Sequence, residues 1–150
     1  MASAARLSCA FLAVLSFGMA SSARAEEMRS LQSFFMEGDK SAADYAMISL
    51  RCTGLSKAYA TAVKLGHIND QQGSDELSKA GPAFLGAVAD LEGIGDFEDA
   101  VASAADKGEE MALQYTDLMI ANINSGKPAV DELIQDDLAQ CLILGRVLMN

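Results

Sequence analysis

The sequence predicts an all-α protein, an antiparallel helical bundle of four long helices plus a short N-terminal helix, stapled by one disulfide. No stretch sustains the alternation of apolar and polar residues that is typical of a β-strand. Apolar residues instead recur at spacings of three and four along four long segments. Short polar connections, most of them containing glycine, join these segments, and short connections favour antiparallel neighbours.

Residues 1–25 have the pattern of a cleaved signal peptide. The opening "MASAAR" supplies a short basic region, "LSCAFLAVLSFGMA" is apolar over 14 residues, and "SSARA" ends in the small-x-small pattern that signal peptidases cut. The apolar stretch is shorter than the roughly 20 residues that a membrane-spanning helix needs. We therefore expect cleavage after Ala25, export to the periplasm, no stable membrane insertion, and a single domain over residues 26–150.

The cysteines predict one disulfide. Cys9 lies inside the leader, so cleavage leaves Cys52 and Cys141 in an oxidising compartment. Each lies in the apolar seam of its own helix, so a bond between them requires those two helices to be neighbours. Such a bond closes a loop of about 90 residues and stabilises the fold by about 4.5 kcal/mol in the chain-entropy model. The alternative is two unpaired cysteines, buried as small apolar side chains.

The first two helices are separated by a glycine turn. "MRSLQSFF" predicts a short helix with one apolar side, ended by "MEGDK" with Gly38 in the turn. That side consists of Met28, Leu31, Phe34 and Phe35. Ser41, followed three residues later by an aspartate, predicts a capping box that opens a helix over residues 41–66. The seam of that helix is Tyr45, Ile48, Cys52, Leu55, Tyr59 and Ala62.

Two helices are apolar on more than one side, which predicts a central position. The last helix contains "CLILGRVLM", and helix 41–66 carries a second apolar stripe. We expect these two helices to form the inner pair, with Phe34 and Phe35 covering the second stripe; a docking groove or a dimer seam on this stripe is the alternative. The stripe consists of Met47, Leu50, Gly54, Thr61 and Leu65.

The three remaining long segments follow in order. "HINDQQGSDE" is expected to connect to the third helix, which Pro82 kinks and "EGIGD" ends. The fourth helix starts near Asp96 and stops through Gly126, and Pro128 fits the first turn of the last helix. The predicted seams are Leu77, Gly81, Phe84, Val88 and Leu91; then Val101, Ala105, Gly108, Met111 or Ala112, Tyr115, Leu118 and Asn122; then Val130, Ile134, Leu138, Cys141, Gly145 and Leu148.

The charge of the mature chain limits its partners. All 21 acidic residues follow the predicted cut, while 11 − 2 = 9 basic residues remain, so the net charge is 9 − 21 = −12. Such an excess repels nucleic acid and anionic lipid head groups. We therefore expect neither as a partner.

We expect no catalytic residue, cofactor or metal. His67, the only histidine, lacks the companions that a metal or catalytic role needs, and a helix end there favours capping or exposure. Read as a calcium loop, "DLEGIGDFED" puts Ile94 and Val101 where ligands are required, so its acids near Asp96 are expected to complement a helix start. The acids of "DDLAQC" and "GEEMA" are expected on solvated faces.

Two functions of different class follow. We favour a periplasmic, non-enzymatic protein that acts by binding another protein, with client protection under envelope stress as one form of that role and a homodimer left open. Its apolar surface would become available on dimer dissociation, release of the first helix or reduction of the disulfide. The alternative is a carrier of a small ligand or cation in a bundle cavity. That cavity would be lined by Tyr45, Tyr59, Tyr115 and Asn122.

Overall fold

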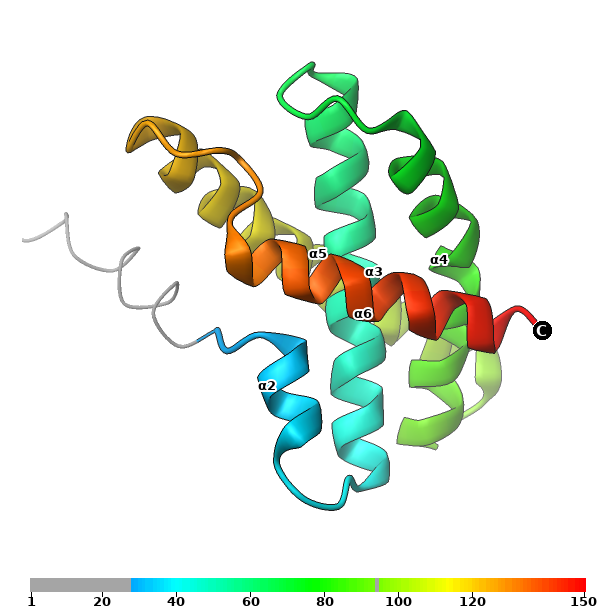
Figure 1. Cartoon of the computed structure of the whole chain (residues 1–150). Helices are drawn as coiled ribbons and strands as arrows, with labels where there is room; N and C mark the ends of the chain where they lie inside the picture. Colours follow the sequence, from blue (N-terminus) through cyan, green and yellow to red (C-terminus); the bar gives the residue numbers. More distant parts are fainter. Residues whose placement is uncertain (1–27, 94) are drawn as a thin grey trace, which may run out of the picture.

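The all-α prediction is confirmed by the computed structural model, which describes residues 28–93 and 95–150. The predicted signal peptide lies outside these residues. Over the described part of the chain there is no strand, and the helices pack into a bundle (Figure 1). They are α2 (Leu31–Met36), α3 (Ala42–Lys64), α4 (Gln71–Glu92), α5 (Phe97–Asn124) and α6 (Glu132–Leu148).

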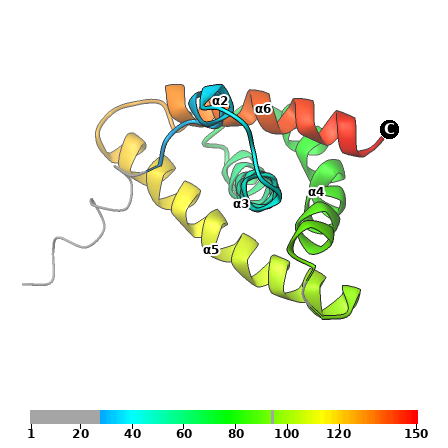
Figure 2. The same cartoon turned by 90° about the horizontal axis from the view of Figure 1, so that it is seen from below.

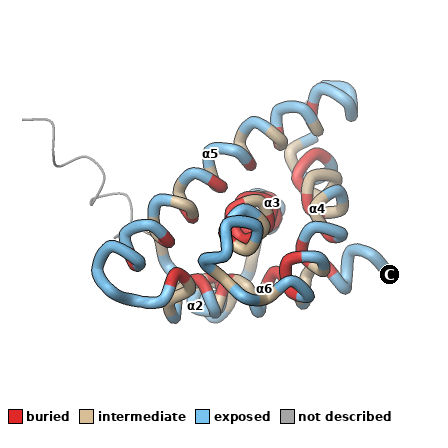
Figure 3. Tube along the Cα trace, turned by 90° about the horizontal axis from the view of Figure 1, so that it is seen from above, coloured by how far each residue is buried: buried red, intermediate tan, exposed pale blue. Residues whose placement is uncertain are grey.

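Helix α3 is the central element. Seen nearly along its axis, it is enclosed on three sides by α4, α5 and α6 (Figure 2). Residues 51–56 are all buried, and six consecutive residues cover more than one full turn, so every side of α3 is covered there (Figure 3). The predicted central position of this helix is confirmed.

Helix α6 lies across α3 instead of alongside it (Figure 1). Its C-terminal half packs on α4, where Gly145 lies against Ala80 and Phe84. The outward side of that half stays accessible, since Ile143 is 55% exposed and Val147 is 67% exposed. The prediction that the last helix belongs to the inner pair is therefore wrong. Because the two helices cross, only a short part of α6 is buried against α3.

At its middle, the second apolar stripe of α3 is covered by α5. Gly54, in the middle of the stripe, lies against Met111 of α5, while Leu65 at its end is 66% exposed. Helix α2 packs chiefly against α6, with Leu31 fully buried. Phe34 and Phe35 pack partly buried at the edge of the core. The prediction that these two phenylalanines cover the stripe is wrong at Gly54, where α5 covers it, and stays a prediction for Met47 and Leu50.

The predicted boundaries of α3 are close to those observed. Ser41 caps the helix: its side chain accepts from the backbone N–H of Asp44, and its own N–H donates to the Asp44 carboxylate at 2.8 Å. This confirms the capping box, in which side chains accept hydrogen bonds from two backbone N–H groups that have no partner within the helix. Gly38 and Gly66, with φ of 66° and 78°, lie in the turns before and after the helix.

Helices α4 and α6 begin elsewhere than predicted. Asp70 caps α4, so the polar stretch "QQGSDE" is helical and not a connection. Pro82 lies inside α4, which bends midway along its length (Figure 1). Asp131 caps α6, so Pro128 precedes that helix and does not lie in its first turn. In both cases the helix starts at a capping aspartate, whereas the predictions relied on a polar stretch for α4 and on Pro128 for α6.

The seam of α5 is shifted in its N-terminal half. Ala100 and Ala104 are buried there, not Val101 and Ala105. Further along, Gly108 and Ala112 are buried as predicted, and so are Tyr115 and Asn122. Small residues on this side bring α5 close to α3: a Cβ at Gly108 would lie 2.7 Å from the Thr53 methyl group.

The close approach of α3 and α5 predicts the effect of a single methyl group. A Cβ at Gly54 would lie 2.7 Å from the backbone carbonyl carbon of Met111, which cannot move aside without moving α5. We expect Gly54→Ala to lower the free energy of unfolding by about 1–3 kcal/mol in urea titrations. Gly86→Ala is the matched control, because nothing lies within 4 Å of its Cβ. That variant should gain about 0.5–1 kcal/mol. Equal effects at both sites would contradict the packing described.

Candidate functional site

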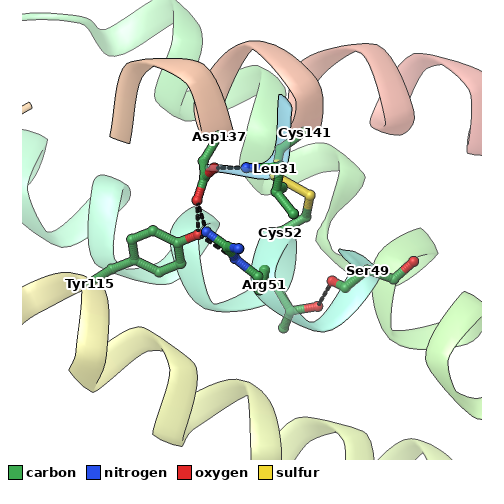
Figure 4. Close-up of a disulfide and its surroundings, with 8 residues drawn as sticks. Leu31, Ser49, Arg51, Cys52, Tyr115, Asp137 and Cys141 are labelled. Atoms are coloured by element: carbon green, nitrogen blue, oxygen red, sulfur yellow. Dashed lines mark hydrogen bonds and ion pairs between the residues drawn. A yellow bond between two sulfur atoms is a disulfide. The ribbon is translucent and has the colours of Figure 1, made fainter. Parts of the chain in front are cut away.

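The predicted disulfide is present and joins the two crossing helices. Cys52 of α3 and Cys141 of α6 are bonded, with 5.3 Å between their Cα atoms and a sequence separation of 89. Both residues are fully buried. This excludes the alternative of two unpaired cysteines. The bond lies at the point where α6 crosses α3 (Figure 4).

A buried polar cluster lies beside the disulfide and consists of Arg51, Tyr115 and Asp137 (Figure 4). The Arg51 guanidinium donates to an Asp137 carboxylate oxygen and to the Tyr115 hydroxyl at 3.2 Å. The same hydroxyl donates to the same carboxylate oxygen. One positive and one negative group therefore neutralise each other, with a tyrosine hydroxyl between them.

The cluster also holds the chain that enters α2. The second Asp137 oxygen accepts from the backbone N–H of Leu31 at 2.5 Å, and a further guanidinium nitrogen donates to the Arg29 carbonyl at 2.6 Å. Four parts of the chain thus meet here, namely the start of α2 and helices α3, α5 and α6. Among the described residues, no buried side-chain nitrogen or oxygen lacks a hydrogen-bond partner. A buried ion pair needs this full set of partners to be tolerated.

Tyr115 is held in its neutral form. Burial raises the pKa of its hydroxyl far above the usual value; Arg51 lowers that pKa and Asp137 raises it. A neutral hydroxyl can accept from the guanidinium and donate to the carboxylate at once, so burial maintains the protonation state on which the cluster depends.

Asp137 was predicted wrongly and Arg51 was not predicted at all. The acids of "DDLAQC" were expected on a solvated face, but Asp137 is fully buried. The predicted seam of the last helix passed through Leu138, whereas the buried positions run from Ile134 to Asp137 to Cys141. The spacing in the sequence could have indicated that Asp137 is buried, since it lies one turn before Cys141 on the same face of the helix.

Tyr59 links α3 to the start of α4 in a similar way. Its hydroxyl donates to one Asp70 oxygen at 2.9 Å, while the other Asp70 oxygen accepts from the Gly73 N–H at 3.0 Å. Burial is the main cause that raises the pKa of Tyr59, and Asp70 raises it further. Asp70 therefore caps α4 and anchors it to α3.

The four residues expected to line a ligand cavity have separate surroundings. Tyr45 is 46% exposed, whereas Tyr59 and Tyr115 are buried in the two clusters just described. Asn122 donates to the Ala129 carbonyl at 3.4 Å, which holds the loop between α5 and α6. Their polar groups serve the fold at separate points and are not brought together around one space.

The remaining candidate residues lie at helix ends. His67 is exposed after the end of α3, and its backbone N–H donates to the Ala62 carbonyl at 2.9 Å. Asp96 caps α5, whose first turn carries Glu98 and Asp99, as the reading of acids at a helix start predicted. Within residues 28–93 and 95–150, no group of three or more His, Cys, Asp or Glu residues is placed to hold a metal ion.

One exposed surface of α5 combines apolar and acidic side chains. We define the α5 outer face as Asp106, Glu110, Leu113, Asp117 and Ile120, which are spaced four, three, four and three residues apart and are all exposed. Leu113 is 64% exposed and Ile120 is 50% exposed. The three carboxylates take part in none of the ion pairs among the described residues. This face is suited to contact with another molecule.

The disulfide predicts a specific pattern of stabilities. Cys52→Ala and Cys141→Ala should each lower the free energy of unfolding by about 2–5 kcal/mol, because each removes the same constraint on the unfolded chain. The double variant should have a free energy of unfolding no lower than that of the less stable single variant. Guanidinium titrations with and without reductant measure this. Additive losses would contradict a shared bond.

The ion pair predicts that removing one partner costs more than removing both. Arg51→Met should cost about 3–5 kcal/mol in urea titrations, because it leaves a buried carboxylate without its counter-charge. The double variant Arg51→Met/Asp137→Leu should recover part of that loss. Lys57→Met, which breaks the exposed pair with Glu109, is the control and should cost less than about 1 kcal/mol. A double variant less stable than Arg51→Met would contradict this account.

Among the helices described, none is long and apolar enough to cross a membrane. Comparison of the chain with protein-family models, with curated proteins and with solved structures found no match.

Proposed function

We propose that this chain is an exported, non-enzymatic protein that acts by binding another protein, and that the α5 outer face is the contact surface. The observation that carries the proposal is the exposure of Leu113 and Ile120 between three carboxylates on one helix face. Large aliphatic side chains gathered on a surface mark sites of protein contact more often than isolated ones do.

The carboxylates specify the chemistry of the partner. Asp106, Glu110 and Asp117 surround the two aliphatic side chains without forming internal ion pairs. The neighbouring Glu109 and Lys107 are already paired, with Lys57 and Glu92. A partner segment with an apolar stripe would cover the two aliphatic side chains, and lysines or arginines beside that stripe would pair with the three carboxylates. We therefore propose a cationic amphipathic segment as the occupant.

Export is supported by two observations. Residues 1–25 have the signal-peptide pattern, and the Cys52–Cys141 bond is of the kind that persists in oxidising compartments. In the periplasm, a helical protein with an acidic, partly apolar face is suited to protect basic client segments. Client protection under envelope stress is therefore the role we favour.

A labelled peptide tests the contact surface. The probe is a fluorescein-labelled, 14-residue leucine–lysine peptide with helical amphipathic spacing, compared with a scrambled peptide of the same composition. Fluorescence anisotropy should show binding that weakens with added salt, because the charges are exposed. The variants Leu113→Ser/Ile120→Ser and Glu110→Gln/Asp117→Asn should each weaken binding by about tenfold or more.

The matched control is Leu65→Ser/Asp90→Asn, which changes an exposed leucine at the C-cap of α3 and an exposed aspartate on α4. It should leave the affinity within about twofold. Equal binding of both peptides, or an equal loss in the control, would overturn the proposed surface. A stoichiometric small molecule or metal in native mass spectra of the periplasmic protein would instead support the carrier hypothesis.

A further inference from the structure

Helix α6 presents a second exposed surface of different chemistry. We define the α6 outer stripe as Gln135, Ala139, Ile143 and Val147, which are spaced four residues apart and are all exposed. Ile143 is 55% exposed and Val147 is 67% exposed. The buried side of α6 runs through Cys141 and Gly145 instead. The stripe therefore lies on the side of α6 that faces away from the core.

The α6 outer stripe carries no charge, although the chain as a whole is strongly acidic. From Gln135 to Asn150, the only acidic side chains are Asp136, which is half-buried, and Asp137, which is buried. The only exposed basic side chain there is Arg146, whose Nε donates to a Glu76 oxygen at 2.6 Å. In the whole sequence, 21 acidic residues outnumber 11 basic ones. A cationic partner would gain no ion pair on this stripe, so its occupant has a different chemistry from that of the α5 outer face.

From this contrast we infer that the α6 outer stripe binds the same stripe of a second copy of the chain. Two copies of an acidic protein repel each other wherever their carboxylates meet. Contact through an uncharged apolar stripe avoids that repulsion while it buries Ile143 and Val147 in both copies. A self-complementary contact of this kind closes as a two-fold symmetric dimer.

The sizes of the side chains fit such a contact. If two α6 helices meet in opposite directions with Ile143 at the two-fold axis, Ala139 of each copy lies opposite Val147 of the other. A small residue then faces a larger one on each side of the axis, which lets the helices approach. Ridges of residues four apart pack into matching grooves at a crossing angle of roughly −50°.

Helices α5 and α6 lie on opposite sides of α3 (Figure 2). A dimer through α6 therefore leaves both α5 outer faces accessible. The inference goes beyond the proposed function, because it concerns a different helix and a different occupant. Variants on α6 test it without changing the α5 outer face, so the two proposals can fail separately.

Sedimentation equilibrium of the purified, oxidised protein between about 1 and 500 µM tests the dimer directly. We expect the weight-average mass to rise from one chain toward two. Ile143→Glu and Val147→Glu should each raise the dimer dissociation constant by at least about 100-fold, because each would bury unpaired carboxylates at the contact. Leu113→Glu on α5 is the control and should leave the constant unchanged. Circular dichroism establishes that all variants keep the helical content of the parent.

A cross-link tests the position of the axis. Ile143→Cys should give a covalent dimer under mild oxidation, since the two introduced thiols would meet at the two-fold axis, whereas Leu113→Cys should form no covalent dimer under the same conditions. A single-chain mass over the whole concentration range would overturn the inference. So would dimerisation that survives both α6 variants, or dimerisation that only Leu113→Glu abolishes.

Discussion

The ion pair between Arg51 and Asp137 is the constraint on which the rest of the structure depends. Apolar packing has no direction, so it does not by itself decide where one helix crosses another. A buried guanidinium and a buried carboxylate do decide it, because each must be met by partners in set directions or the fold loses several kcal/mol. The start of α2 and helices α3, α5 and α6 all supply such partners. The disulfide acts at the same crossing, since Cys52 follows Arg51 and Cys141 lies one turn after Asp137.

The features that could be predicted from the sequence are those indicated by a short local pattern or by the number of cysteines. Helix-period spacing predicted the helices, and the Ser41 capping box predicted the start of α3. The two cysteines that remain after the predicted cut, each on the apolar seam of its own helix, predicted the disulfide. The buried cluster had no such signal, because a carboxylate is ordinarily exposed and the guanidinium that balances Asp137 is 86 residues away. The direction of α6 was missed as well, since an apolar stripe indicates that a side is buried but not the angle at which it crosses its neighbour.

The shifted seam of α5 has a different cause. Around its first turns the sequence reads "AVASAA", so either of two adjacent seams would place mostly small residues toward the core. Tertiary contacts chose between them: α5 is held by its glycine at position 108 and by Tyr115 in the cluster. Where the sequence offers equivalent faces, the register of a helix is set by its most specific contact elsewhere. The face left outside then carries the acidic and aliphatic groups on which the proposed function rests.

The burial of the disulfide has a consequence for how the molecule is made. Neither sulfur-bearing residue has any accessible surface once the helices are in place, so an oxidising enzyme or small oxidant cannot reach the thiols in the finished fold. The bond must therefore form before the helices close around Cys52 and Cys141, or during an opening of the fold. A chain that folds with reduced cysteines has to open again, at least locally, before these thiols can react.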